Sequence, residues 1–348
     1  LTQRLGFSQM RIFLTLAVVF GTGDGLADET WLPFRSDTSG GTFYDVWMAD
    51  GSTGWTVRSG GDILKTEDGG TTWIPQVSGA VRTLLGVGGV SPSKVVAVGR
   101  GGSLQVWDGV EWTGQSSGTE ENLNAVIGIA GDDFWACGDR GTMLHWDGVG
   151  WSQSPTPVES DLQALWASGP DDIWAVGGNE VIRWDGNAWS QMAYPGTGAE
   201  SVWGDAGGNV WVGGSRLFRW DGSVWDAGQD LSTKIKGIWG SSANDVWFVG
   251  NRRDTFFHFD GSSVSLVALG GPSNFGLFDA ITGTGADHLI AVGGDSMVRK
   301  WDGNTWDLVH QFSSTFLRGG FWVSGSSEIV GADGRSIVRL DGDQWVQE

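Results

Sequence analysis

Six basic side chains recur at one position of a repeated turn, two residues before an Asp-Gly pair. They are His145, Arg183, Arg219, His258, Lys300 and Arg339. The first two copies of the turn break this pattern with Thr66 and Val106. In an extended strand each basic residue points to the opposite face from its successor, which is often tryptophan. A cation stacked on a neighbouring aromatic ring or paired with a carboxylate is the favoured interpretation. The alternative is a ring of equivalent binding sites for an anionic or neutral sugar.

The sixth copy of the repeat differs from the others in a way that could mark a single site. It contains Arg252 and Arg253, followed closely by Phe256 and Phe257. A unique ligand site or a catalytic site requires one group of residues that is unlike its counterparts. Arg252 and Arg253 are therefore candidate ligand-binding residues.

Carboxylate pairs also recur, before the second strand expected in several copies. They occur at Asp132-Asp133 and Asp171-Asp172, and in reduced form at Asn244-Asp245. Ca²⁺ takes six to eight oxygen ligands, more than such a pair offers, whereas Asp and Asn favour turns by hydrogen bonding to nearby backbone. These pairs are therefore predicted to be turns. Because no catalytic triad motif, zinc spacing or phosphate loop occurs in the chain, no catalytic residue, metal or cofactor is predicted.

The turns that position these residues repeat along the chain. Asp-Gly pairs begin at Asp68, Asp108, Asp147, Asp185, Asp221, Asp260, Asp302 and Asp341, at intervals of 36 to 42 residues. Asp-Gly between two apolar runs predicts a hairpin, because glycine accepts the positive φ of the turn. Four short strand-like runs in each interval match one blade of a β-propeller. The sequence thus predicts an all-β propeller of eight four-stranded blades, with seven blades as the alternative.

The predicted blades divide one propeller domain at residues 28 to 348. Their approximate ranges are 40–78, 79–118, 119–157, 158–195, 196–230, 231–270, 271–311 and 312–348. The chain contains 23 Trp and 59 Gly among 348 residues. Because 22 of the tryptophans fall at four repeated positions, they are predicted to pack in the blades. The single cysteine, Cys137, lies in an apolar run and is expected to be a core residue.

Charge and targeting patterns limit the partners that we expect. The formal net charge of −20 disfavours nucleic acid and anionic lipid. Arg11, the apolar run at 12–20 and the small residues before Asp28 predict a signal peptide at residues 1–27, with cleavage near Ala27. No stretch is long enough for a membrane span. We therefore expect a secreted or periplasmic monomer whose partner is a glycan or an envelope or extracellular protein.

The first turn, from Thr66 through Asp68 and Gly69 to Trp73, resembles the Asp-box of bacterial neuraminidase repeats. The whole repeat array is similar to secreted bacterial propellers of the Asp-box and photosystem II assembly-factor type, and has some likeness to bacterial propeller lectins. The resemblance implies that the Asp-box and the related turn aspartates are structural. A sialidase of this kind would need a Tyr nucleophile and an arginine cluster. Only Tyr44 and Tyr194 are present, and the catalytic residues are not evident.

These observations predict a non-catalytic binding or scaffold protein. It would recognise glycans or protein partners through repeated propeller loops. The alternative is a polysaccharide hydrolase or lyase with its site in the central funnel.

Overall fold

The computed structural model describes residues 41–253, 255–269, 276–294, 297–311, 319–322, 329–332, 337–341 and 344–347, with side chains described as far as residue 309. The predicted signal peptide lies outside these ranges and stays a prediction. Among the described residues, no helix has the length and apolar character needed to cross a membrane.

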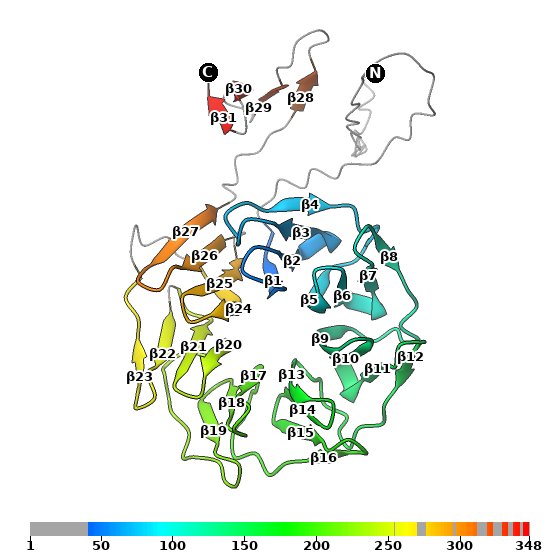
Figure 1. Cartoon of the computed structure of the whole chain (residues 1–348), viewed down its shortest axis with the longest axis vertical. Coiled ribbons are helices and arrows are strands. Elements are labelled where there is room, and N and C mark those ends of the chain that lie inside the picture. The colour runs from blue at the N-terminus through cyan, green and yellow to red at the C-terminus, as the bar shows by residue number, and fades with distance from the viewer. Residues whose placement is uncertain are drawn as a thin grey trace, which may run out of the picture. The chain divides into compact units, whose positions relative to one another are not determined.

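Seven antiparallel sheets form a ring between Gly40 and Ser313 (Figure 1). The first sheet comprises β1 (Phe43–Met48), β2 (Gly54–Arg58), β3 (Ile63–Thr66) and β4 (Ile74–Gln76). The second comprises β5 (Leu84–Ser91), β6 (Lys94–Gly99), β7 (Leu104–Trp107) and β8 (Trp112–Gly114). The third comprises β9 (Leu123–Ala130), β10 (Asp133–Gly138), β11 (Met143–Trp146) and β12 (Trp151–Gln153). The fourth comprises β13 (Ala164–Gly169), β14 (Asp172–Gly177), β15 (Glu180–Trp184) and β16 (Trp189–Gln191).

The remaining three blades follow the same order. The fifth comprises β17 (Ser201–Gly204), β18 (Val210–Gly213) and β19 (Leu217–Trp220), with isolated bridges to Trp225 and Gln229 in place of a fourth strand. The sixth comprises β20 (Ile235–Ser242), β21 (Asp245–Gly250), β22 (Phe256–Phe259) and β23 (Val264–Leu266). The seventh comprises β24 (Phe278–Gly285), β25 (His288–Gly293), β26 (Met297–Trp301) and β27 (Trp306–Gln311). Single 3₁₀ turns, η1 (Ser59–Gly61), η2 (Arg100–Gly102) and η3 (Asp139–Gly141), join second and third strands in the first three blades.

The prediction of eight blades is wrong, because the ring closes with seven. Phe43 and Val46 of the first blade share a buried core cluster with Ile290 and Val292 of the seventh. Each of these two sheets is built from consecutive strands, so side-chain packing closes the ring and no strand is shared. The eighth repeat forms its own four-stranded sheet, β28 (Gly319–Trp322), β29 (Ile329–Ala332), β30 (Ile337–Asp341) and β31 (Gln344–Gln347). That sheet lies in a different unit from residues 40–313.

The Asp-Gly turns are held by a recurring pair of hydrogen bonds. In the third blade, Asp147 Oδ1 accepts the backbone N–H groups of Val149 at 2.9 Å and Gly150 at 3.1 Å. Gly148 adopts a φ of 92°, a backbone conformation that residues with a Cβ atom rarely adopt. The same two bonds form at Asp108, Asp185, Asp221, Asp260 and Asp302. These backbone N–H donors hold the pKa of each of these carboxyls below its ordinary value.

Tryptophan clusters pack one blade against the next. Trp174 on the second strand of the fourth blade lies with its ring centroid 6.3 Å from both Trp220 and Trp225 of the fifth. Equivalent triplets join three further pairs of blades: Trp55 with Trp107 and Trp112, Trp135 with Trp184 and Trp189, and Trp247 with Trp301 and Trp306. The second-strand tryptophans are almost fully buried. The regular spacing of tryptophan in the sequence therefore reflects the packing of neighbouring blades. We call the surface along which two blades pack a seam.

We expect Trp174→Ala to lower the free energy of unfolding by about 3–5 kcal/mol, because it removes a large side chain that is only 1 % exposed. Val149→Ala is the matched control, since Val149 is 89 % exposed at a turn and its loss should change stability by less than about 0.5 kcal/mol. Urea unfolding of both variants measures the difference. A loss similar to that of the control would contradict the role given to the seam.

Candidate functional site

Four of the six basic residues predicted from the repeat lie on the tryptophans of their own blades. His145 is paired across the sheet with Trp135, and the two rings stack at 4.1 Å. His145 Nε2 also lies 2.9 Å from Asp133 Oδ1. In the next blade, Arg183 lies 5.3 Å from the ring of Trp174. The predicted cation-aromatic contact is thus an internal feature of the blade.

Carboxylates and amides complete this arrangement. Arg183 Nε donates to Asp172 Oδ1 at 2.7 Å, and the indole N–H of Trp174 donates to the same oxygen at 3.0 Å. Arg219 lies 5.3 Å from the ring of Trp211 and donates to Asn209 Oδ1 at 2.9 Å. The residue that begins the second strand, or directly precedes it, therefore anchors the cation over the tryptophan.

His258 repeats the same geometry in the sixth blade. It stacks on Trp247 at 4.3 Å, and its Nε2 lies 2.6 Å from Asp245 Oδ1. The indole N–H of Trp247 shares that oxygen. In four blades the accessible face of the second-strand tryptophan is thus covered by a side chain of the same blade.

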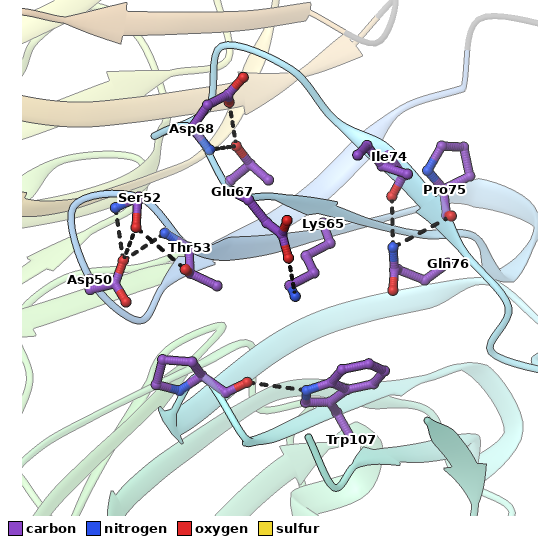
Figure 2. Close-up of polar contacts among 12 residues, drawn as sticks. Asp50, Ser52, Thr53, Lys65, Glu67, Asp68, Ile74, Pro75, Gln76 and Trp107 are labelled. Atoms are coloured by element: carbon purple, nitrogen blue, oxygen red, sulfur yellow. Dashed lines mark hydrogen bonds and ion pairs between the residues drawn. The ribbon is translucent and has the colours of Figure 1, made fainter. Parts of the chain in front are cut away.

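The structure adds one member to this set that sequence alignment on the turn aspartate missed. Lys65 is paired across the sheet with Trp55, and its Nζ lies 5.6 Å from that ring. Glu67 is an extra residue in this turn, so counting back from Asp68 falls on Thr66 instead. Figure 2 shows the ion pair between Lys65 and Glu67, at 2.6 Å, beside Asp68. Counting residues back from the turn therefore misses Lys65, whereas its pairing with Trp55 across the sheet identifies it.

The other predicted site residues are not brought together. Lys300 is paired across the sheet with Ile290 rather than with a tryptophan. Arg252 and Arg253 lie exposed in the loop that follows β21. Arg339 and Asp341 lie on β30, whose side chains are outside those described.

The Asp-box turn of the first blade packs against the seventh. Asp68 Oδ1 accepts from the N–H of Thr72 at 2.8 Å, and Thr66 Oγ1 donates to the same oxygen at 2.9 Å. A Cβ on Gly70 would come within 2.4 Å of Ile290 Cδ1, so the turn lies directly on the seventh blade. Ile290 occupies the position that is tryptophan in five other blades. This turn therefore contributes to the seam at which the ring closes.

A cavity of about 410 Å³ lies at the centre of the ring and is lined by the innermost strands of all seven blades. At one position in each blade, a different type of residue lines it. These residues are Tyr44, Leu85, Asn124, Gln163, Glu200, Lys236 and Asp279. We call them the channel ring.

β-Bulges place the channel ring. In β1, β5, β9, β20 and β24 the channel-ring residue is skipped in the pairing with the second strand. The N–H of Gln163 donates to the carbonyl of Val176, although Val176 is also paired with Ala164. The N–H of Glu200 likewise donates to the carbonyl of Gly213, which is also paired with Ser201. Bulges re-aim side chains and are frequent beside functional sites. The irregular pairing thus sets the channel-ring residue apart from its neighbours at the cavity wall.

The charges in the channel ring lie on three adjacent blades. Glu200 forms ion pairs with both Lys234 and Lys236. Burial raises the pKa of Asp279 above its ordinary range, although the ammonium of Lys236 partly opposes the shift. In the second to fourth blades the channel-ring residues are uncharged. The cavity wall therefore has one charged arc and one neutral arc.

Asp45 adds a further carboxylate to the charged arc. It follows Tyr44 and stands where the other inner strands have Gly, Ala or Ser. Its Oδ1 accepts the N–H of Val46, and its Oδ2 accepts the N–H of Val87 on β5, both at 2.9 Å. Burial raises the pKa of Asp45 to about 7, against the smaller lowering by these two N–H groups. The carboxylate thus joins the first blade to the second at the cavity wall.

Sequence reasoning missed the channel ring, although a signal for it exists. Tyr44, Gln163, Glu200 and Lys236 each lie three residues before a first-strand tryptophan. At this position the residue type changes from blade to blade, whereas apolar residues recur one residue before it. This variation at one position of an otherwise regular repeat is the signal in the sequence that indicates the channel ring.

The fold and the cavity together define the chain as a seven-bladed β-propeller. No protein-family profile and no curated protein matches it. Among solved structures, YCF48 bound to D1 peptide superposes with a TM-score of 0.63 and 16 % identity, covering 76 % of this chain and 92 % of that one. YCF48 from Cyanidioschyzon merolae gives 0.62 and 14 %, covering 77 % and 97 %. The WD40 β-propeller domain of Doa1 gives 0.61 and 12 %, covering 75 % and 92 %. These likenesses confirm the propeller fold and show the fold alone.

We expect the stability contributed by Asp45 to depend on pH. Its pKa in the folded chain, about 7, exceeds the ordinary 3.8. The contribution is therefore fully present below about pH 4 and is lost as the pH rises through about 7. Relative to Asp45→Asn, the native chain should lose on the order of 4 kcal/mol of unfolding free energy across that range. Urea unfolding over a pH series measures this, with the exposed Asp307→Asn as control. A difference that stays constant with pH would contradict the assignment.

Proposed function

We propose that this chain is a non-catalytic binding protein that recognises a segment of a partner polypeptide at the channel ring. The observation that carries the proposal is the channel ring itself, in which the seven blades place seven different residue types around one cavity. A single asymmetric site of this kind suits a ligand with a defined sequence, because a polypeptide offers a different group at each residue.

The contrast with the outer parts of the blades supports this choice. There the repeated tryptophans are buried in seams between blades, and Lys65, His145, Arg183, Arg219 and His258 lie against them. A sugar that stacks on tryptophan needs an accessible ring face, and these faces are already occupied. Repeated glycan sites remain a prediction from the sequence, and the channel ring is the better-supported site.

The solved structures are consistent with a polypeptide ligand. YCF48, at 16 % identity, has been observed with a D1 peptide bound, and the WD40 propellers share the same scaffold. At this identity the likeness supports the use of a propeller for peptide binding and does not transfer the ligand.

One observation favours a second candidate, a polysaccharide hydrolase or lyase in the central cavity. Asp45 has a pKa of about 7, and raised carboxyl pKa values are typical of general acids in glycoside cleavage. Against this, both of its oxygens accept backbone N–H groups at 2.9 Å. That geometry favours a structural carboxylate over a proton donor to substrate.

The test is selection of random peptides displayed on phage against the full chain. Peptides that bind are then measured with Gln163→Ala and Lys236→Gln, which alter opposite arcs of the channel ring. We expect each substitution to weaken binding at least tenfold, or about 1.4 kcal/mol. Arg183→Gln is the control, because it removes a cation over Trp174 and leaves the channel ring intact.

Two results would overturn the proposal. One is peptide binding that survives both channel-ring substitutions. The other is saturable binding on a glycan array that is lost in Arg183→Gln and retained in Gln163→Ala and Lys236→Gln, which would support repeated sugar sites. Cleavage of a polysaccharide that is lost in Asp45→Asn would support the hydrolase or lyase instead.

A further inference from the structure

We propose that the polypeptide recognised by this chain inserts a cationic side chain, lysine or arginine, into the cavity beside Tyr44, Asp45 and Asp279. This inference rests on the proposed function and adds the chemistry of the group that anchors the ligand. The three residues come from β1 and β24, the innermost strands of the two blades that meet where the ring closes.

The charges around the cavity are unequally compensated. Four charged residues line it, namely Asp45, Glu200, Lys236 and Asp279. Glu200 is paired with Lys236 and also with Lys234. Among the described residues, no ion pair joins Asp45 or Asp279 to a cation. The wall formed by β1 and β24 therefore presents two carboxyl groups without an ion-pair partner in the described chain, although the ammonium of Lys236 lowers the pKa of Asp279 in part.

The surroundings of these two carboxylates favour an incoming cation. Burial raises the pKa of both, so each lies where a negative charge is poorly solvated. An opposite charge nearby would favour the ionised form. The charged residues that line the cavity on the blades preceding Asp45 around the ring are Asp279 on β24 and, one blade further, Lys236 on β20. The adjacent strand β5 carries no charged residue, and Arg58 on β2 is paired with Asp62.

The shape and composition of this wall suit an organic cation. Tyr44 lines the cavity beside the carboxylates, and the face of an aromatic ring attracts ammonium and guanidinium groups. Within the described part of the chain, no three His, Cys, Asp or Glu side chains are grouped as a metal site requires. The cavity of about 410 Å³ falls within the roughly 300–1,000 Å³ typical of ligand pockets.

The charge of the whole chain acts in the same direction. A formal net charge of −20 attracts cationic partners and speeds their encounter with the protein. Inside the cavity, the carboxylates of Asp45 and Asp279 would then select a positive side chain over a neutral or acidic one.

The experiment uses small probes that represent single side chains. n-Butylammonium, n-butylguanidinium, n-butanol and n-butyrate are titrated into the ¹⁵N-labelled full chain, with the backbone amide signal of Val87 as the readout. This N–H donates to Asp45, so it reports events at the proposed site. We expect saturable shifts with the two cations and none with butanol or butyrate. The ratio of the two cation affinities distinguishes lysine from arginine.

Matched Asp→Asn substitutions locate the binding. Asp279→Asn should weaken cation binding at least threefold, and Asp45→Asn should do the same while keeping an oxygen that accepts the Val87 N–H. Asp307→Asn, on the exposed surface of β27, should leave it unchanged. If Asp45→Asn does not fold, Asp279→Asn decides the matter alone. Equal shifts with butyrate, or cation binding unaffected by Asp279→Asn, would overturn the inference.

The peptides selected on phage separate this inference from the proposed function. Peptides that need the channel ring but show no enrichment of lysine or arginine would leave the proposed function standing and overturn the cationic anchor. Binding of the two cations without any peptide that needs the channel ring would overturn the proposed function and leave only a cation site in the cavity.

Discussion

The packing of tryptophan between neighbouring blades is the interaction on which the rest of this propeller depends. Each blade is a small sheet with too little apolar area to be stable alone, so its faces must be buried against its neighbours. Trp174 is covered by Trp220 and Trp225 from the next blade as well as by Arg183 from its own. The repeated cations thus belong to the seams, where they lie over buried rings and are anchored by carboxylates such as Asp172.

The seam between the first and seventh blades is packed by different residues from the other seams described above. Ile290 replaces the tryptophan of the seventh blade, and the Asp-box turn of the first blade lies against it at Gly70. Propellers must also avoid an open sheet edge where the ring closes. Here the first and seventh sheets are each complete, and side-chain packing joins them. The chemical difference of the first repeat is therefore accounted for by its position in the ring.

Within each blade, the repeated residues and the residues that vary lie on different strands. The outer and middle strands repeat their residues because four of the seams pack the same triplet of tryptophans. On the innermost strands, the channel-ring residues line the cavity and differ in type from blade to blade. Glu200, Lys236 and Asp279 differ there without disturbing the packing around them. A regular scaffold can thus carry one irregular site.

The propeller class could be predicted from the sequence, because it depends on local turns and on strand alternation. The sequence also favoured contact of the repeated cations with aromatic rings or carboxylates, and His145, Arg183 and Arg219 do lie on tryptophan. It did not determine the number of blades in the ring, since eight copies of a motif do not specify which two sheets meet. It also did not reveal Lys65, whose role depends on pairing register, or the channel ring. Tyr44, Glu200 and Asp279 are far apart along the chain, and only closure of the ring places them around one cavity.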